Sequence, residues 1–107
     1  MFARVSTYEF PVDQCDEAVG AFRRALAALA EIRALPGLTD AYFFVDRETG
    51  HGQTVTVWDS AETMAASRVR ASRLRTEAAT AVDGGVQSSN EYEVCVHETG
   101  AAVAETA

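Results

Sequence analysis

The stretch TDAYFFVDRETGHGQTVTVW (residues 39–58) has two segments rich in aromatic and β-branched residues, joined by a glycine-bearing loop. This pattern is typical of a β-hairpin. We therefore predict strands over residues 39–47 and 52–58 that pair with each other. The run YFFV (42–45) makes both faces of the first strand apolar, so we expect both faces to be covered.

A helix and another strand precede this hairpin. Apolar side chains recur there at spacings of four, three, four and three residues: Cys15, Val19, Phe22, Leu26 and Leu29. This period predicts an amphipathic helix over residues 13–34, which Pro36-Gly37 ends. Side chains of residues 2–10 alternate in direction along a first predicted strand.

A second helical region follows the hairpin. Asp59 or Ser60 can cap it, and with Asp59 as the cap, Glu62 completes a capping box. The region extends to about Val82, where two glycines follow.

The residues of this second helical region do not fit one straight amphipathic helix. On a helical wheel one face collects Ala61, Met64, Ala65, Arg68, Ser72, Arg75, Ala79 and Val82. Leu74 falls nearly opposite, and Arg68 falls in the middle of the face. We therefore expect a break near residues 70–73.

Residues 88–98 alternate in direction and predict the last strand. The resulting order, β-α-β-β-α-β, is that of a ferredoxin-like α+β fold with a four-stranded antiparallel sheet and both helices on one face. We expect one domain over residues 1–98 and a short flexible tail over 99–107. The other sheet face then needs a cover, and a second copy of the chain is the simplest one.

The composition limits the kinds of partner. A net charge of −7 disfavours nucleic acid, because phosphate binding needs a basic face. All nine cationic residues are arginines, which excludes a lysine Schiff base and a Walker-type phosphate loop. Cys15 and Cys95 are too few for a disulfide framework, and no apolar run is long enough for a signal peptide or a membrane span. We expect a cytoplasmic protein with reduced thiols and no membrane partner.

Three features in this order resemble the antibiotic biosynthesis monooxygenase domain family: the long first helix ending in LPGL (35–38), the hairpin, and a strand ending in WDSAE (58–62) at a helix start. The resemblance covers about residues 2–98. It implies a dimeric α/β barrel, in which two ferredoxin-like sheets close on each other and each subunit has a pocket between sheet and helices. The family includes cofactor-free oxygenases of polycyclic aromatic substrates and haem-degrading oxygenases.

The sequence departs from both of the family's described active sites. Arg68 stands where haem-degrading members have the histidine that binds iron, and an arginine stays protonated and cannot bind iron. Residues 5–8 also lack the asparagine that those members carry on their first strand. Thr54 and Ala78 stand where quinone-forming members have an asparagine and an arginine. The histidines and cysteines lack metal-ligand spacing, so we expect no cofactor and no metal.

Five residues are candidates for a site. Arg68 is the catalytic candidate, as an anion or enolate clamp, and the alternative is a solvent-reaching side chain or an ion pair with a glutamate. Trp58 matches the family's tryptophan and is either a core anchor or a pocket wall. Tyr8 and Ser6 share one strand face, and together with Thr54 they are substrate-binding candidates. A tyrosine on a strand can equally pack with its hydroxyl at the rim.

Other polar residues have ordinary interpretations. Arg75 would join Arg68 if the helix continues. Glu91 and Glu93 are expected to be solvated strand charges, and His97 an edge or interface residue.

Two functional hypotheses remain. The first is a homodimeric, cofactor-independent monooxygenase that acts on a small aromatic or polyketide-like molecule, with Arg68 stabilising an anion. The second is a non-catalytic dimer that binds a small apolar molecule or has a structural role. A haem-degrading oxygenase is a third, less favoured hypothesis because of Arg68.

Overall fold

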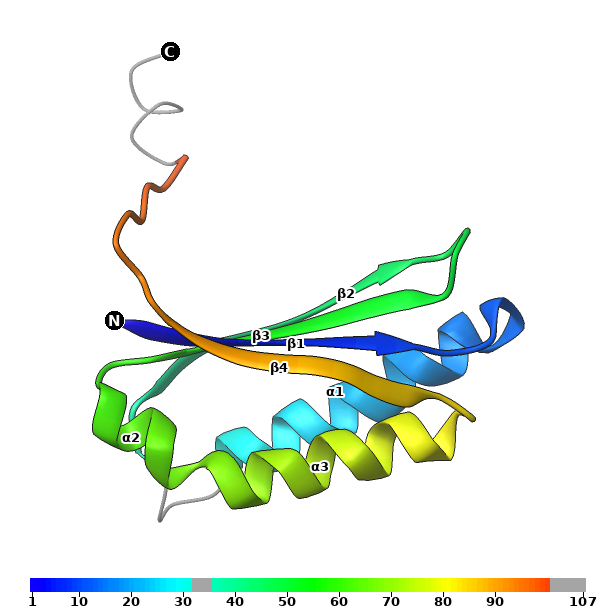
Figure 1. Cartoon of the computed structure of the whole chain (residues 1–107), viewed down its shortest axis with the longest axis horizontal. Helices are drawn as coiled ribbons and strands as arrows, with labels where there is room; N and C mark the ends of the chain where they lie inside the picture. Colours follow the sequence, from blue (N-terminus) through cyan, green and yellow to red (C-terminus); the bar gives the residue numbers. More distant parts are fainter. Residues whose placement is uncertain (32–35, 101–107) are drawn as a thin grey trace.

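The chain folds into one four-stranded antiparallel sheet with its helices packed on a single face (Figure 1). The computed structural model describes residues 1–31 and 36–100. In chain order the elements are β1 (Phe2–Glu9), the short 3-10 helix η1 (Val12–Gln14), α1 (Cys15–Glu31), β2 (Leu38–Asp46), β3 (His51–Trp58), α2 (Ala61–Ala66), α3 (Arg68–Ala81) and β4 (Gly85–Glu93). The strand order is β2-β3-β1-β4. The predicted β-α-β-β-α-β order and ferredoxin-like sheet are therefore confirmed.

The first strand, β1, lies in the middle of the sheet and pairs with the last strand, β4, so that the two ends of the domain lie side by side. It pairs antiparallel with β3, with Ser6 opposite Thr54, and with β4, with Arg4 opposite Glu91. Because side chains alternate along a strand, one face of β1 turns toward the helices and the other away from them. Arg4 and Ser6 lie on the helix-facing side and are buried.

The core between sheet and helices has an aromatic centre. Tyr8 and Phe22 are fully buried, with ring centroids 4.5 Å apart, and Phe43 stacks on Phe22 at the same centroid distance. These contacts join β1, α1 and β2. The apolar side chains of α1 thus pack against the sheet, as their spacing predicted, and Phe22 lies at the centre of the core.

Trp58 belongs to a second core cluster at the other end of the sheet. It is fully buried and packs with Leu29, Met64 and Ala71. Its indole N–H donates to Thr56 Oγ1 at 3.1 Å, which satisfies its polar group.

The turn at Pro36-Gly37 leads into β2 and lies against the start of α2. Gly37 has φ +100°, and a Cβ there would lie 2.5 Å from Asp59 Oδ1. The Gly37 carbonyl accepts a hydrogen bond from the Asp59 backbone N–H at 2.8 Å. Glycine is required here because the chain adopts a left-handed conformation against the end of β3.

The second helical region begins at one of the two predicted caps and breaks at a residue other than those predicted. Ser60, rather than Asp59, is the N-cap, and it forms a capping box with Thr63 rather than with Glu62. The break lies at Ser67, between α2 and α3, rather than at residues 70–73. This break changes the phase of α3, so that Leu74 turns toward the core, contrary to the predicted wheel.

The last strand also differs from its prediction of residues 88–98. β4 begins at Gly85, opposite Glu9, and ends at Glu93. One further backbone bond, from Val94 N–H to the Met1 carbonyl, precedes an extended arm that leaves the body of the molecule (Figure 1). The end of the predicted first helix, and most of the predicted tail over 99–107, lie outside the described residues.

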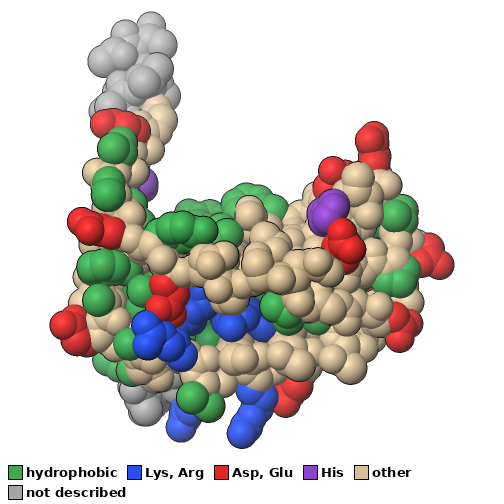
Figure 2. All heavy atoms as spheres, viewed as in Figure 1, with side chains coloured by type: hydrophobic (Ala, Val, Ile, Leu, Met, Phe, Trp, Pro, Cys, Tyr) green, Lys and Arg blue, Asp and Glu red, His purple; other side chains and the backbone are tan. Residues whose placement is uncertain are grey.

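The sheet face that turns away from the helices is apolar and exposed in the single chain. Tyr42 and Phe44 of β2 stack at 5.8 Å between ring centroids and are 47% and 51% exposed. Tyr92 of β4 is also 51% exposed. We expected both faces of β2 to be covered. Within residues 1–31 and 36–100, no segment covers the face of β2 that carries Tyr42 and Phe44. Figure 2 shows apolar side chains along this side of the sheet.

None of the helices in the described ranges is both long enough and apolar enough to cross a membrane.

Candidate functional site

A solvent-filled cleft lies between the edge strand β4 and helix α3. Its volume is about 420 Å³. It is lined by Arg4, Arg68, Ser72, Arg75, Ser89, Asn90 and Glu91. Figure 2 shows arginine side chains gathered in this hollow. We call it the arginine cleft.

A smaller cavity continues from the arginine cleft into the space between sheet and helices. Its volume is about 20 Å³. Its helix side is apolar and consists of Phe22, Ala25, Leu26, Leu29, Ala71 and Leu74. Its sheet side carries the hydroxyls of Ser6, Thr54 and Thr56, and it shares Arg4 and Arg75 with the cleft. We call it the inner cavity.

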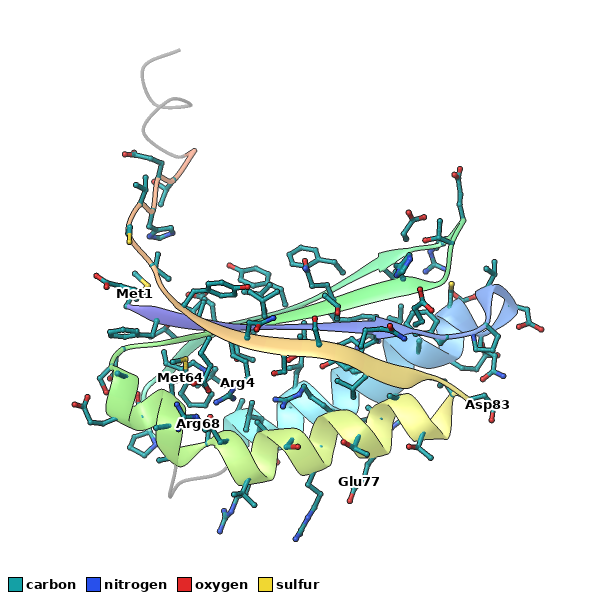
Figure 3. All side chains as sticks on the ribbon, viewed as in Figure 1. Met1, Arg4, Met64, Arg68, Glu77 and Asp83 are labelled. Carbon is teal, nitrogen blue, oxygen red and sulfur yellow. The ribbon has the colours of Figure 1, made fainter. Side chains whose placement is uncertain are left out.

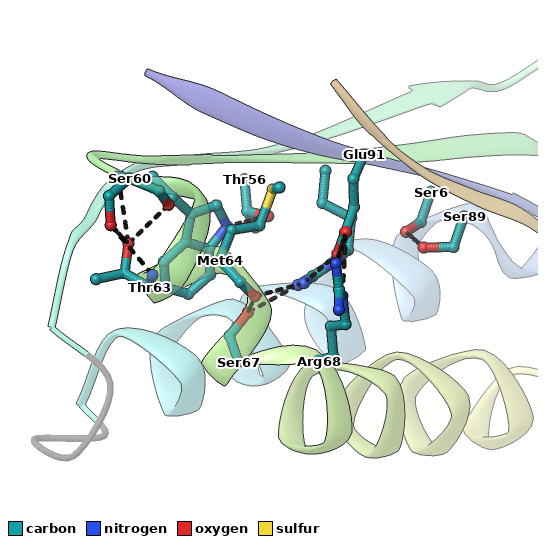
Figure 4. A network of polar contacts seen from close by, with 11 residues as sticks. Ser6, Thr56, Ser60, Thr63, Met64, Ser67, Arg68, Ser89 and Glu91 are labelled. Atoms are coloured by element: carbon teal, nitrogen blue, oxygen red, sulfur yellow. Dashed lines mark hydrogen bonds and ion pairs between the residues drawn. The ribbon is translucent and has the colours of Figure 1, made fainter. Parts of the chain in front are cut away.

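Arg4 is the buried anchor of this region, at 3% exposure. Its Nη2 donates to the Met64 carbonyl at 2.8 Å, and its Nη1 donates to Ser67 Oγ at 3.0 Å. Both acceptors belong to the break between α2 and α3, where a helix end leaves a carbonyl available. Figure 3 shows Arg4 and Met64 close together between the sheet and this break, and Figure 4 shows Met64 and Ser67 at the break.

Glu91 joins Arg4 to Arg68 across the mouth of the cleft (Figure 4). One carboxylate oxygen lies 2.8 Å from Arg4 Nη2, and the other lies 2.6 Å from Arg68 Nη2. The hydrogen bonds from Arg68, together with those from Arg4, lower the pKa of Glu91 from 4.5 to about 2. Glu91 is therefore a fixed negative charge and a very weak base at neutral pH.

Arg75 is the guanidinium that remains without a counter-ion. Its side chain is half-buried, and within residues 1–31 and 36–100 its buried Nε has no hydrogen-bond partner. Burial lowers the pKa of Arg75, an effect that the nearby Tyr8 hydroxyl and Glu91 partly oppose. The cleft thus holds three arginines against one glutamate, an excess of two positive charges in a chain of net charge −7. Such a site favours an anionic group.

A row of hydroxyls lies on the sheet beside Arg75. Tyr8 and Thr54 share a hydrogen bond of 2.7 Å, and Ser6 shares one of 2.9 Å with Ser89. Burial raises the pKa of the Tyr8 hydroxyl, although the hydrogen bond with Thr54 opposes this shift. Tyr8 is therefore a neutral hydrogen-bonding group at physiological pH.

The structure brings most of the predicted site residues into one region. Ser6 and Thr54 line the inner cavity, and Tyr8 contacts it through Thr54. Arg68 lies at the mouth of the cleft with its side chain 61% exposed, so its predicted place in the middle of an apolar face is wrong. The glutamate ion pair weighed for Arg68 is present. Trp58 packs in the core and reaches the inner cavity only through its hydrogen bond to Thr56.

Two residues of the site were not predicted from the sequence. Glu91 is the counter-ion of two arginines and not a solvated strand charge. Arg4 shares a strand face with Ser6 and Tyr8, which was a signal that it turns inward. The signal for Glu91 is its position opposite Arg4, which requires the register of β1 and β4.

Metal-binding groups do not cluster near this region. Over the described ranges, no three His, Cys, Asp or Glu side chains are placed to hold a metal ion. His51 is an exposed partner of Glu9 at 3.2 Å, and His97 lies in the exposed arm beyond β4.

Comparison with known proteins yields structural relatives. No family model and no curated protein matches the sequence. SnoaB, a cofactor-independent oxygenase from Streptomyces nogalater, is 15% identical, with a TM-score of 0.65 over 90% of this chain and 94% of its own. An antibiotic biosynthesis monooxygenase is 15% identical, with a TM-score of 0.61 over 90% of this chain and all of its own. A dimeric ferredoxin-like protein from an uncultured marine organism is 14% identical, with a TM-score of 0.70 over 92% and 99%.

These likenesses, at such low identities, concern the fold. They agree with the resemblance carried by LPGL (35–38) and WDSAE (58–62), and with the observed strand order. The chain has the ferredoxin-like fold of the antibiotic biosynthesis monooxygenases.

Proposed function

We propose that the protein is a cofactor-independent monooxygenase that binds a small aromatic or polyketide-like molecule in the arginine cleft. One observation carries this proposal: Arg75 presents a half-buried guanidinium without a counter-ion beside an apolar cavity. In this proposal the anionic oxygen of the ligand binds Arg75 and its aromatic ring lies in the arginine cleft, whose volume of about 420 Å³ suits a small ring, whereas the inner cavity of about 20 Å³ does not. The fold shared with SnoaB supports the choice of reaction class.

The chemistry asked of the protein is modest. A deprotonated phenol or anthrone-type substrate can itself reduce dioxygen, with the balance CH₂ + O₂ → C=O + H₂O. The positive charge of Arg75 lowers the pKa of the bound substrate hydroxyl and stabilises the resulting oxyanion. The proton passes to hydroxide or buffer in the solvent, since Glu91, with its pKa lowered to about 2, stays ionised in its ion pairs with Arg4 and Arg68 and does not serve as the base.

The residues divide into three roles in this proposal. Arg75 takes the anion-stabilising role that the sequence assigned to Arg68. Arg68 holds Glu91 in place, since their atoms lie 2.6 Å apart. Ser6 and Thr54, with Tyr8 behind Thr54, form the polar wall of the inner cavity next to the substrate.

Oxygen uptake with a panel of phenolic and anthrone-type substrates tests the proposal. We expect Arg75→Met to lower kcat/KM by about 10² or more, as loss of an oxyanion partner does. Arg73→Met removes an exposed arginine from the same helix and should leave the rate unchanged. Equal rates for the two variants would exclude the role of Arg75.

A non-catalytic binding or structural protein is the alternative. The observation that favours it is the small size of the inner cavity, about 20 Å³, together with the complete burial of Trp58. Tight binding of an anionic aromatic molecule, without oxygen uptake for any substrate of the panel, would favour this alternative.

We also propose that the protein is a homodimer. The exposed apolar sheet face, with Tyr42, Phe44 and Tyr92, is a surface that a second copy can cover. The dimeric state of the ferredoxin-like relative supports this assembly.

A further inference from the structure

We infer that the inner cavity is the binding site for dioxygen, beside a substrate held in the arginine cleft. This inference rests on the proposed oxygenase function and adds a place for the second reactant. The cavity has a volume of about 20 Å³, which is above the roughly 10–15 Å³ that a single water needs and suits one diatomic molecule. Apart from Arg75, its helix wall is apolar and includes Phe22, Leu26 and Leu29.

The sheet-side hydroxyls around the cavity already have hydrogen-bond partners within the described residues, which gives a water few partners there besides Arg75 Nε. On the sheet side, Ser6 bonds to Ser89, Thr54 to Tyr8, and Thr56 accepts from the Trp58 indole. A buried water is stable when it makes two to four hydrogen bonds. Dioxygen is apolar and requires none.

Arg4 is likewise engaged with neighbours outside the cavity. Its guanidinium donates to Glu91, Ser67 and the Met64 carbonyl. Arg75 Nε is therefore the one side-chain donor known to lack a partner in this part of the described chain.

The guanidiniums of Arg4 and Arg75 add positive charge to this largely apolar cavity. When the substrate anion transfers one electron to neutral dioxygen, it leaves a substrate radical and superoxide. Arg4 and Arg75 line the cavity and stabilise this new negative charge. The radical and superoxide then join through a C–O bond, and the resulting peroxide loses water to give the carbonyl. The cavity thus binds the neutral reactant through its apolar wall and stabilises the reduced form through charge.

The inner cavity and the arginine cleft share part of their lining, so an electron passes only a short distance from substrate to dioxygen. Arg4 and Arg75 line both the inner cavity and the arginine cleft, so their side chains form the boundary between the two. A substrate oxyanion held by Arg75 from the cleft side therefore lies next to a molecule in the cavity.

Xenon pressure on crystals of the whole protein is the first test, since xenon occupies apolar cavities without any chemistry. We expect one xenon atom in the inner cavity. An ordered water bound to Arg75 in that place, with no xenon, would overturn the inference and leave the oxygenase function standing.

A cavity-filling variant gives the second test. Ala25 lines the cavity from α1, so Ala25→Leu should remove the xenon atom and raise the KM for dioxygen by about tenfold, with little change in the Kd of the aromatic ligand. Ala27→Leu places the same side chain on the exposed face of α1 and serves as the control. Thermal unfolding of both variants checks that they fold.

The outcomes separate the two proposals. An unchanged KM for dioxygen in an Ala25→Leu protein that has lost its xenon atom would exclude the oxygen site. Xenon binding by a protein that consumes no oxygen with any substrate would refute the oxygenase function and, with it, the cavity's role in catalysis.

Discussion

At the scale of single residues, Glu91 has the largest electrostatic role. It is the counter-ion of Arg4, which is buried to 3% exposure, and of Arg68 at the surface. Removing one partner of a buried ion pair costs more than the pair contributes, because a charge stays buried without compensation. The arginine cleft therefore depends on one carboxylate.

Acid titration tests this role. The pKa of Glu91 is lowered from 4.5 to about 2, so its contribution to stability is complete above pH 4.5 and is lost as the pH falls to about 2. We expect Glu91→Gln to lower the free energy of unfolding at neutral pH by about 2 kcal/mol and to flatten its pH dependence in this window. Glu93→Gln, at an exposed position of the same strand, is the control in denaturant titrations at several pH values. A wild-type pH profile retained by Glu91→Gln would contradict this role.

The sequence suggested an anion site and assigned it to Arg68, whereas the function proposed above assigns it to Arg75. An arginine on an otherwise apolar helix face suggested an anion site, and Arg75 has this environment. Arg68 was the expected residue because the wheel ran through Ser67 without a break. The break lies at Ser67 rather than at the predicted residues 70–73, so Arg68 begins α3 and is exposed at the mouth of the cleft, while Arg75, seven positions along, is half-buried.

At the scale of elements, the break between α2 and α3 depends on β1. Ser67 is fully buried, donates to the Met64 carbonyl at 2.7 Å, and accepts from Arg4 Nη1 at 3.0 Å. The Met64 carbonyl lies at a helix end, and within the described residues it has no backbone partner of the kind that a continuous helix would provide. The side chains of Ser67 and Arg4 donate to it there. The break is thus held by a residue of a strand that lies 63 positions earlier in the sequence.

The substitution Ser67→Ala tests this dependence. It leaves an Arg4 donor without its acceptor, and we expect a loss of about 1–3 kcal/mol in the free energy of unfolding. Thr76→Ala, at an exposed position of α3, should change it by less than about 0.5 kcal/mol. Chemical denaturation followed by circular dichroism measures both. Equal stability of the two variants would show that the break does not need Arg4.

The elements themselves were predictable where the pattern is local. The hairpin and the long first helix follow from side-chain periodicity, and both occur within a residue or two of the expected bounds in the described chain. The sequence left the cap open between Asp59 and Ser60, and it did not predict the start of β4 at Gly85. Thr63 completes the capping box at Ser60, and pairing with Glu9 extends β4 to a glycine that looked like the end of a helix.

At the scale of the whole molecule, the exposed sheet face is the surface through which we propose that two copies associate. An apolar patch that includes three half-exposed aromatic side chains is unusual on a monomer. The two sheet faces of β2 differ strongly, since Phe43 packs in the core while its neighbours Tyr42 and Phe44 turn outward.

A charge placed on this face should separate the copies. Size-exclusion chromatography with light scattering should give about twice the chain mass of 11.5 kDa for the wild type. Phe44→Glu should shift the protein toward the monomer mass, because two carboxylates would be buried in the interface. Val69→Glu is the control, since Val69 is 77% exposed on α3. A wild-type monomer at micromolar concentration would refute the dimer.

The bond between Arg4 and Glu91 also has a consequence for the order of events during synthesis. Its two residues are 87 positions apart, so almost the whole domain must leave the ribosome before they can meet. At the usual rate of translation this delay is on the order of ten seconds. During that time the nascent chain contains β1, α1 and α3 but lacks Glu91, the carboxylate that neutralises Arg4. No nascent fragment that ends before Glu91 can hold the binding site in its final form, and the last strand to be made is the one that completes it.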